Sequence, residues 1–341
     1  MTSLELDDRY SRQVLFRGIG AAGQQKLAAG RVAIVGCGAT GSALASLLAR
    51  AGVGTIRIID RDYIETSNLQ RQSLFDEKDA AESLPKAVAA AGKIAAFNSQ
   101  IVVEPQVADL TPANVDSLLE GMGLILDGTD NFETRYLIND FAVKNSLPWI
   151  YTGAVGSYGV TMNILPGRTA CLACIFPGVP HGTMETCDTA GILNSVVNLG
   201  ASIAATEAIK FLVGAESQLR RTLLSFDVWC NERGEIAADK PHPGCRACDR
   251  HEFPHLSGEE RPHITLCGRN SVQIHERHRP IDLAQMSERL KPHGKVKHND
   301  FVLKFWRDPY EITLFPDGRA IIKGTTDTAV ARSLYARYVG A

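Results

Sequence analysis

The sequence predicts an α/β protein with a doubly wound, mostly parallel sheet of the Rossmann type. An antiparallel continuation, a zinc knuckle and a small C-terminal α+β domain are expected to follow. Apolar runs of strand length alternate with helical segments as far as residue 145, which is typical of a parallel sheet covered on both faces. The run Val32–Val35 passes directly into the glycine loop Gly36-Cys37-Gly38-Ala39-Thr40-Gly41, which indicates nucleotide binding. Two CxxC pairs, at 171/174 and 245/248, predict the zinc knuckle.

The first half of the chain is expected to alternate strands and helices after a helical lead-in over residues 9–30. Pro85 favours the start of a helix, which places Lys86 in its first turn. The expected strands are 32–35, 55–60, 100–107 and 123–127, and the expected helices are 40–51, 85–96 and 131–145.

The pattern changes after residue 148. Strands are expected at 149–153, 159–165 and 222–229, and a glycine-containing connection between the first two predicts antiparallel pairing. The weakly polar stretch from Ala190 to Gly214 is expected to be a buried helix and not a membrane span. Four polar or charged residues interrupt it, namely Asn194, Asn198, Glu207 and Lys210.

A domain boundary is expected after residue 250. Residues 1–250 form the predicted nucleotide-binding domain with the zinc site, and residues 251–262, rich in His, Glu, Pro and Arg, form the predicted linker. Residues 263–341 form the predicted small domain, with Pro316-Asp317-Gly318-Arg319 as a hairpin turn. Its expected elements are 264–266, 271–274, 283–290, 301–306, 310–315, 320–323 and 329–338.

Composition narrows the class of protein and its partners. With 36 Lys and Arg against 38 Asp and Glu, the formal net charge is −2, which predicts no binding to nucleic acid or to an anionic membrane. The acidic N-terminus lacks the apolar core of a secretory signal. Four of the eight cysteines stand in the CxxC pairs, which favours metal binding in a reducing cytoplasm over disulfides.

A glycine loop between a strand and a helix offers backbone N–H groups and a helix N-terminus to phosphate. Gly36, Gly38 and Gly41 allow the tight turn and the close approach of the ligand that such a loop requires. Asp60, 19 residues beyond Gly41 at the end of the next strand, is placed to accept hydrogen bonds from ribose hydroxyls. These features predict an adenine nucleotide but do not separate NAD from ATP.

Two cations and a carboxylate favour ATP over NAD as the nucleotide. Arg71 and Lys86 are placed by their order along the chain to contact a triphosphate, and Asp130 is suited to hold Mg²⁺ after a strand. Either cation, taken alone, is also compatible with a solvated surface charge. An NAD-dependent oxidoreductase, the alternative on the same glycine loop, needs no such set. The sequence also offers no His–Asp pair for hydride-transfer chemistry.

Several motifs in combination resemble the ThiF/MoeB/HesA adenylyltransferases, bacterial relatives of the ubiquitin-activating enzymes, over residues 9–248. They are Arg9-Tyr10-Ser11-Arg12-Gln13, Gly36–Gly41, Asn68-Leu69-Gln70-Arg71-Gln72, Pro85-Lys86, Thr129-Asp130-Asn131 and the CxxC pairs. The resemblance implies ATP-dependent adenylylation of the C-terminal Gly-Gly tail of a ubiquitin-like sulfur-carrier protein. The products would be an acyl-adenylate and pyrophosphate, in thiamine-thiazole or molybdopterin synthesis.

The resemblance also implies roles for single residues. Arg12 would reach across a homodimer interface to the γ-phosphate of ATP on the neighbouring subunit. Asp130 would hold Mg²⁺, Asp60 would bind the ribose, and Arg12, Arg71, Lys86 and Asp130 would form the catalytic set. The implied nucleotide-binding residues beyond the glycine loop are Asp60, Asp62, Asn68, Arg71, Gln72, Lys86, Asp130 and Asn131. In one departure from the family pattern, Ser83 stands where glycine is usual, three residues before the lysine.

The cysteines fall into two groups. Cys171, Cys174, Cys245 and Cys248 supply the four thiolates that zinc prefers, so the site is expected to be closed and structural. Cys187 precedes the long helix, whose N-terminus would favour a thiolate, but Asp188 beside it works against one. A covalent role in catalysis and a spectator role both stay open for Cys187.

The implied partners are the sulfur carrier and a second copy of the chain, with a cysteine desulfurase or sulfurtransferase as a further candidate. The C-terminal residues are similar to a tail appended to some Bacillus-type members of the family, and they are expected to help dock the carrier or the dimer partner. Two other functions stay open on this fold. One is an adenylylating enzyme that modifies a peptide, and the other is a binding scaffold that has lost catalysis.

Overall fold

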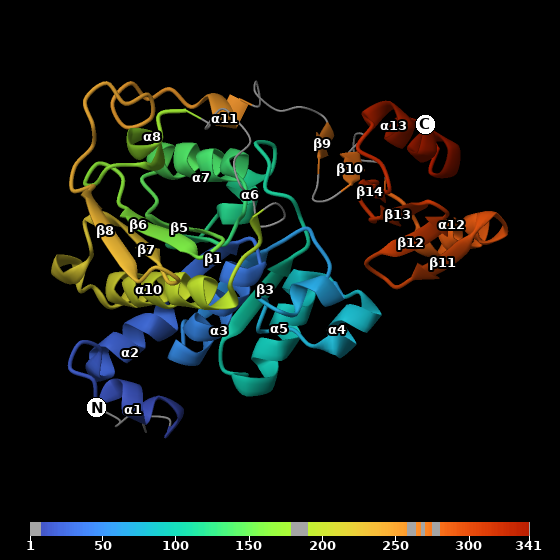
Figure 1. Ribbon diagram of the computed structural model, residues 1–341. Coiled ribbons are helices and arrows are strands. Elements are labelled where there is room, and N and C mark those ends of the chain that lie inside the picture. The colour runs from blue at the N-terminus through green and yellow to red at the C-terminus, as the bar shows by residue number, and fades with distance from the viewer. Residues whose placement is uncertain (1–7, 179–189, 258–263, 267–269, 275–279, 341) are drawn as a thin grey trace. The chain divides into compact units, whose positions relative to one another are not determined.

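The computed structural model describes residues 8–178, 190–257, 264–266, 270–274 and 280–340. The chain divides into two units, Met1–Glu259 and Glu260–Ala341. Each unit has its own sheet and its own apolar core, and the two are described separately (Figure 1).

The first unit is built on an eight-stranded sheet with the order β3-β2-β1-β4-β5-β6-β7-β8. The first five strands in this order are parallel to their neighbours, and the chain winds from β1 to one edge before it continues on the other side at β4. The doubly wound, mostly parallel sheet is therefore confirmed. Its parallel strands are β1 (Arg31–Val35), β2 (Thr55–Ile59), β3 (Val102–Gln106), β4 (Leu124–Asp127) and β5 (Trp149–Val155).

The antiparallel continuation is also present. It comprises β6 (Tyr158–Ile164), β7 (Thr222–Asp227) and β8 (Glu232–Ala237), paired in that order beyond β5. The sequence did not predict β8, because every one of its side chains is exposed and no alternation of apolar residues marks it.

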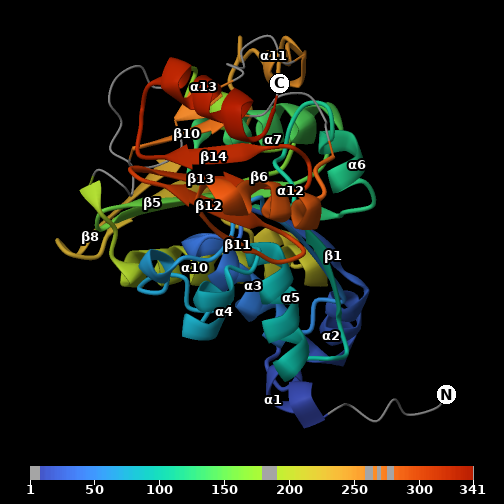
Figure 2. The ribbon, with the colours of Figure 1, turned by 90° about the vertical axis from the view of Figure 1, so that its right-hand side faces the viewer.

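Helices cover both faces of this sheet. Alternate side chains of β1 point to opposite cores, Val32 and Ile34 to one and Ala33 and Val35 to the other. The first core is closed by α2 (Gly20–Ala29), α3 (Ala39–Ala51), α5 (Lys86–Phe97) and α10 (Asn194–Val213). The second is closed by α6 (Val115–Leu119), α7 (Phe132–Lys144) and α8 (Leu172–Ile175). α7 and α10 accordingly lie on opposite sides of the sheet in both views (Figures 1 and 2).

α10 is long and apolar enough to cross a membrane by length and composition. Half of its most apolar window is buried inside the unit, where it packs against α3, β5 and β6. Its buried side includes Ala201, Ala204 and Ala208, whose small size lets the helix approach the sheet closely. Shorter elements of the unit are α1 (Ser11–Val14), a 3₁₀ turn η2 (Thr66–Asn68), α4 (Glu77–Glu82) and α11 (Pro254–Ser257).

The second unit is an antiparallel sheet with two helices. Its strand order is β11-β12-β13-β14-β10-β9, and the predicted turn at 316–319 joins β13 to β14 as a hairpin. Phe305, Leu314 and Ile322 form its core with side chains of both helices. The elements are β9 (Ile264–Leu266), β10 (Ser271–Ile274), α12 (Leu283–Leu290), β11 (Lys295–His298), β12 (Leu303–Arg307), β13 (Tyr310–Leu314), β14 (Ala320–Lys323) and α13 (Thr328–Tyr338). The small α+β fold is therefore confirmed.

Candidate active site

The glycine loop lies where the strand order of the first sheet reverses. β1 has β2 on one side and β4 on the other, so the loops that follow these three strands meet at one edge of the sheet. In open α/β sheets this reversal point is where ligands bind. The loop passes directly into α3, which begins at Ala39 and turns its N-terminal N–H groups toward that edge.

Contacts inside the loop explain two of its three glycines. A Cβ atom on Gly41 would lie 1.8 Å from the carbonyl oxygen of Gly36, which no side chain can tolerate. Gly36 has a φ of +84°, in the left-handed region that favours glycine, and its Cβ would lie 2.7 Å from the carbonyl oxygen of Gly128. These two glycines let the loops after β1 and β4 touch.

Gly38 is different, because the space above it is open. The nearest atom to a Cβ there is Nε2 of Gln72, at 3.9 Å. Gln72 is 3% exposed, and its Oε1 has no hydrogen-bond partner among the described residues. A buried amide oxygen without a partner is costly, so a ligand that donates a hydrogen bond there would be favoured. An open glycine beside an unsatisfied buried amide fits a nucleotide site.

Asp60 joins the ends of two strands. Its Oδ2 accepts a hydrogen bond from the Cys37 N–H at 2.5 Å, and its Oδ1 accepts from the Asp62 N–H at 2.6 Å. Burial raises the pKa of Asp60, partly opposed by the positive charge of Lys86. Each carboxylate oxygen has a second lone pair, so the side chain can still accept from a ribose hydroxyl.

Lys86 lies in the first turn of α5 and is 7% exposed. Its Nζ donates to Oδ2 of Asp62 at 3.1 Å, and its backbone N–H donates to the carbonyl oxygen of the same residue at 2.9 Å. Burial alone would lower the pKa of Lys86, but the negative charges of Asp62, Asp60 and Asp130 outweigh it and raise the pKa. Lys86 is therefore a permanent buried cation beside three carboxylates.

The loop after β4 is held by a buried ion pair that the sequence did not predict. Asp127, fully buried, accepts from Nε of Arg135 at 3.0 Å and from the Thr129 N–H at 2.8 Å. Arg135 also donates to the Thr129 carbonyl oxygen at 2.6 Å. The available signal was an arginine in the second turn of a helix that follows a strand ending in aspartate. The pair fixes the backbone that carries Asp130.

The remaining predicted residues differ in their exposure and in their contacts. Asp130 is exposed, and its charge acts on both Lys86 and Arg135. Asn131 caps α7, where its Oδ1 accepts from the Thr134 N–H at 2.8 Å. Two others make contacts within their own loop: Asn68 Oδ1 accepts from the Glu65 N–H, and Arg71 Nη1 donates to the Ser67 carbonyl oxygen.

Arg12 is not brought to the glycine loop of its own chain. It is exposed on α1, which is tied to the C-terminal end of α3 by a hydrogen bond from Gln13 Nε2 to the Ala51 carbonyl oxygen at 2.8 Å. The glycine loop is at the other end of this 13-residue helix, about 20 Å away at 1.5 Å per residue. In the described structure Arg12 therefore lies apart from the glycine loop of its own chain.

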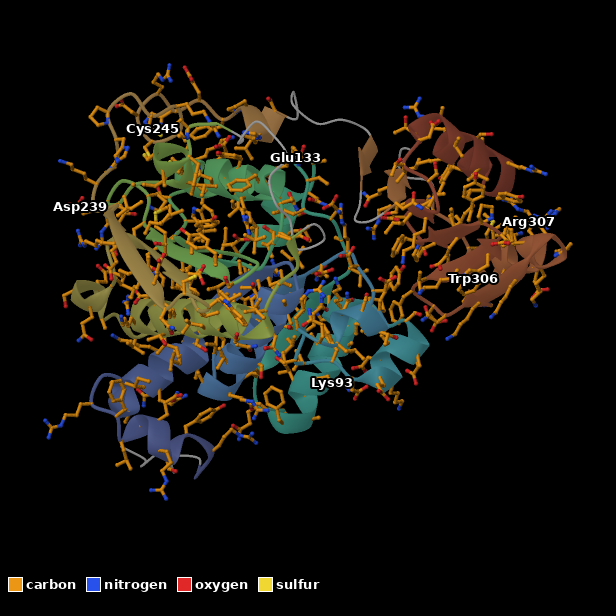
Figure 3. The ribbon with its side chains drawn as sticks, viewed as in Figure 1. Lys93, Glu133, Asp239, Cys245, Trp306 and Arg307 are labelled. Atoms are coloured by element: carbon orange, nitrogen blue, oxygen red, sulfur yellow. The ribbon has the colours of Figure 1, made fainter. Side chains whose placement is uncertain are left out.

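The four CxxC cysteines come together on the α7 side of the sheet. Their sulfur atoms all lie within 4.8 Å of one another, and Cys245 lies beside α8 (Figure 3). The Cys171–Cys174, Cys171–Cys245 and Cys174–Cys248 sulfur distances are 3.8, 3.7 and 3.6 Å. A tetrahedron of zinc–sulfur bonds of about 2.3 Å has edges of about 3.8 Å, so the four thiols fit a closed zinc site.

Hydrogen bonds among the thiols of this cluster shift their pKa values. Hydrogen bonds from the Cys171 and Cys248 thiols lower the pKa of Cys174, which also accepts from the His242 N–H at 3.4 Å. A thiolate is the form of cysteine that binds metal. Cys187 lies outside the described residues.

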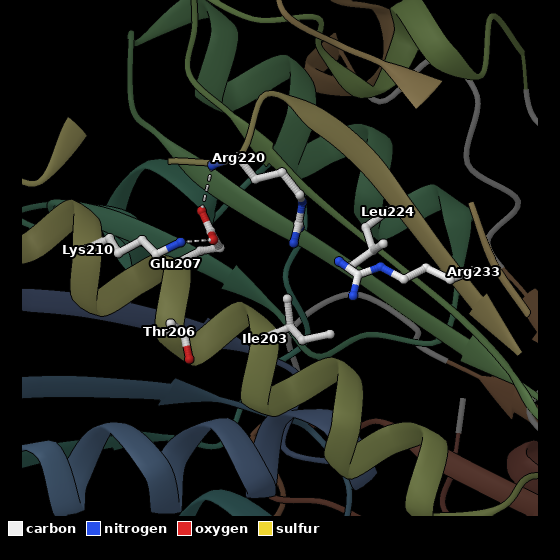
Figure 4. Close-up of a pocket in the computed structure, with 7 residues that line it drawn as sticks. All are labelled: Ile203, Thr206, Glu207, Lys210, Arg220, Leu224 and Arg233. Atoms are coloured by element: carbon white, nitrogen blue, oxygen red, sulfur yellow. Dashed lines mark hydrogen bonds and ion pairs between the residues drawn. The ribbon is translucent and has the colours of Figure 1, made fainter. Parts of the chain in front are cut away.

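A separate pocket of about 350 Å³ lies between α10 and the antiparallel strands (Figure 4). Glu207, 3% exposed, accepts from Lys210 Nζ at 2.6 Å, from the Arg220 N–H at 3.0 Å and from Asn163 Nδ2 at 2.5 Å. The buried carboxylate is thus satisfied within the protein. This cluster ties α10 to the sheet and lies apart from the residues of the glycine loop.

Comparison with known proteins agrees with this geometry. The ThiF family matches residues 10–247. The chain is 44% identical over 336 residues to the sulfur carrier protein ThiS adenylyltransferase of Bacillus subtilis (strain 168), covering 97% of this chain and 99% of that protein. It is 34% identical over 248 residues to the sulfur carrier protein adenylyltransferase of Thermus thermophilus, covering 71% and 90%. The crystal structure of E. coli MccB with ATP is similar with a TM-score of 0.62 and 25% identity, covering 71% of this chain and 74% of that one. The chain therefore belongs to the ThiF family.

Proposed function

We propose that the chain is an ATP-dependent adenylyltransferase that activates the C-terminal glycine of a ubiquitin-like sulfur-carrier protein. The observation that carries the proposal is the buried cation Lys86 beside the glycine loop, with Asp60, Asp62 and Asp130 around it. The similarity to the ThiS adenylyltransferase covers nearly the full length of both chains and supports a carrier of the thiamine-thiazole type.

The reaction joins two anions. An oxygen of the carrier's terminal carboxylate attacks the α-phosphorus of ATP, and the bond from that phosphorus to the β-phosphate bridging oxygen breaks. The products are the carrier acyl-adenylate and pyrophosphate, so no redox partner is needed. A carboxylate is already ionised at neutral pH, so the enzyme needs no general base for this step.

Preplaced positive charge is what the enzyme must supply, because the leaving pyrophosphate gains negative charge. In our assignment Lys86, Arg71 and Asn68 contact the phosphates, and the N–H groups of the loop from Gly36 to Gly41 cradle them. Asp60 and Asp62 hold the ribose and Lys86, and Gln72 donates or accepts beside Gly38. Asn131 acts through the cap it provides for α7.

Two metal ions belong to the proposal. Asp130 would hold Mg²⁺, which when bound neutralises phosphate charge and orients the leaving group. Cys171, Cys174, Cys245 and Cys248 would hold Zn²⁺, whose four bonds would tie together two loops distant in sequence.

The assembly and location follow from the same assignment. A cytoplasmic homodimer would let Arg12 of one copy serve the nucleotide of the other, since α1 lies far from its own glycine loop. A cysteine desulfurase or sulfurtransferase would then deliver sulfur to the activated carrier. Cys187 stays a candidate for a covalent link to the carrier.

The test is ATP–pyrophosphate exchange with purified protein and two carriers, of the thiamine and the molybdopterin type. Each carrier is compared with a version lacking its terminal glycine. Exchange that requires one intact carrier would support the proposal and identify the pathway. Nucleotide binding without exchange by either carrier would contradict the carrier as substrate and favour an enzyme that adenylylates a peptide.

A further inference from the structure

α7 carries two polar residues in succession that are fully buried, Asn139 and Asp140. Asn and Asp are unfavourable inside helices, and a buried carboxylate is costly unless it is paired. Neither residue belongs to the nucleotide site described above. Their contacts lead instead to the four-cysteine cluster.

Asn139 holds the first cysteine pair. Its Oδ1 accepts a hydrogen bond at 2.8 Å from the backbone N–H of Leu172, the residue that follows Cys171. Leu172 is the first residue of α8, and its N–H has no partner within that helix. The contact therefore fixes the short turn that presents Cys171 and Cys174.

Asp140 holds the second pair. Both of its carboxylate oxygens lie 3.0 Å from Nη1 of Arg246, which stands between Cys245 and Cys248. The same guanidinium nitrogen donates to the carbonyl oxygen of Glu252 at 3.2 Å, and Oδ2 of Asp140 accepts from the His255 N–H at 3.3 Å. The loop that presents the second pair is thus fastened to α7 at a point between its two cysteines and again beyond them, at His255.

We propose that Asn139 and Asp140 are positioning residues for the metal site. Adjacent on one helix, they hold the two cysteine-bearing segments in fixed positions relative to each other. The pairs are 74 residues apart, and without the metal the four thiols have no covalent link. Four thiolates repel one another, so a clamp on both backbones keeps the set assembled while metal enters or leaves. The inference rests on zinc at these cysteines, as assigned in the proposed function.

The experiment compares zinc release from full-length variants. Asp140→Asn keeps the shape of the side chain but removes the charge that holds Arg246, and Asn139→Leu removes the acceptor of the Leu172 N–H. The matched control is Glu207→Gln, which removes a buried, ion-paired carboxylate of the same unit. Glu207 stands on α10 (Figure 4), and this helix packs on the face of the sheet opposite to the cysteines. Arg246→Met provides a second route to the same break should Asp140→Asn fail to fold.

Zinc release is measured under native conditions with a chromogenic chelator, and thermal unfolding is recorded for every variant. Outer-shell partners of metal ligands typically change metal affinity by about 10–100-fold. We expect the clamp variants to release zinc about 10–100-fold faster than the unaltered protein, and Glu207→Gln to release it at the unaltered rate even where its unfolding temperature falls equally. Co²⁺ in place of Zn²⁺ should show weaker or shifted tetrahedral thiolate absorption in the clamp variants alone.

Equal release rates in the clamp and control variants would overturn the inference, because the pair would then serve only general stability. A purified protein that contains no zinc and takes up none would overturn it together with the zinc assignment. Carrier-dependent pyrophosphate exchange by that same protein would leave the adenylyltransferase assignment standing.

Discussion

Gly41 and Gly38 stand in the same loop but meet different surroundings. A methyl group on Gly41 would collide with the Gly36 backbone, whereas one on Gly38 would point into open space beside Gln72. We expect Gly41→Ala to lower the unfolding temperature and abolish nucleotide binding. Gly38→Ala should leave the unfolding temperature without ATP nearly unchanged. It should abolish the increase in unfolding temperature that ATP produces, because the methyl group occupies the place of the ligand.

Thermal unfolding of both variants with and without ATP checks this contrast. An unaltered rise with ATP in Gly38→Ala would show that the nucleotide does not approach the loop at this glycine. Gly92→Ala is the control, since a Cβ there meets nothing within 4 Å and it stands in a helix away from the loop.

The Asp127–Arg135 pair gives a second prediction at the scale of single residues. Both side chains are buried, so Arg135→Met leaves a carboxylate without its counter-charge. Breaking one side of such a pair typically costs about 3–5 kcal/mol of unfolding free energy. Urea unfolding should show this loss for Arg135→Met and a smaller loss for the double variant Asp127→Leu, Arg135→Met. A loss of unfolding free energy in the double variant that equals or exceeds the loss in Arg135→Met would contradict the pairing.

One buried carboxylate, Glu207, adds polar contacts to the apolar packing that attaches α10 to the strands. Burial alone would raise the pKa of Glu207, but the hydrogen bonds from Lys210, the Arg220 N–H and Asn163 outweigh it, so the pKa lies below the ordinary value of 4.5. In the pH range between the lowered pKa of Glu207 and 4.5, the unfolded chain therefore binds more protons than the folded protein. Glu207 contributes stability above pH 4.5 that is lost as the pH falls through its lowered pKa.

Glu207→Gln should accordingly lower the free energy of unfolding most at neutral pH, and the difference from the unaltered protein should narrow below pH 4.5. Urea unfolding at neutral pH and near pH 4 measures it. Glu235→Gln is the control, because Glu235 lies on the exposed strand β8. A difference that stays constant with pH would show that the carboxylate is not the source of the stability.

α7 connects two regions of the first unit. Its N-terminal end is capped by Asn131 and pairs Arg135 with Asp127 at the nucleotide edge, and its middle carries Asn139 and Asp140 toward the cysteines. Periodicity predicted this helix to within a residue at each end. It could not predict these contacts, because each partner comes from a different segment of the chain.

The position of Arg12 gives a prediction for the whole assembly. If Arg12 serves the partner's nucleotide, Arg12→Ala and Lys86→Ala should each be inactive as homodimers. In a mixed dimer, one site combines an intact Lys86 with an intact Arg12. Random reassembly of equal amounts should then restore about a quarter of the unaltered exchange rate, since half of the dimers carry one working site of two. No restoration in a mixture that does exchange subunits would contradict action across the interface.

The division into two units allows the second one to be removed. A chain ending at Glu259 retains the first sheet and both of its cores, so it should fold and bind ATP. If the C-terminal unit docks the carrier or the partner copy, this chain should need more carrier to reach half of its maximal exchange rate. Calorimetry with ATP and exchange titrated with carrier separate the two properties. An unaltered carrier dependence would contradict docking by this unit.

The sequence by itself determined the elements that carry their own pattern. Apolar runs, glycine positions and a proline before Lys86 act through local backbone preference and burial, and the strands of the parallel sheet, α3, α5 and α7 appear where they were expected. β8 and β11 were missed, because their side chains are largely exposed and polar and leave no alternation to read. The four cysteines were identified by spacing alone.

Only the tertiary structure decided which groups face one another. It gave Asp60 two backbone donors, buried Arg135 against Asp127, brought cysteines 74 residues apart to within bonding range of one metal, and left Arg12 at the far end of α3 from its own glycine loop. The physical reason is that a hydrogen bond or ion pair between distant segments depends on how whole elements pack. A sequence records that packing only as which residues are apolar, not as which polar groups will meet.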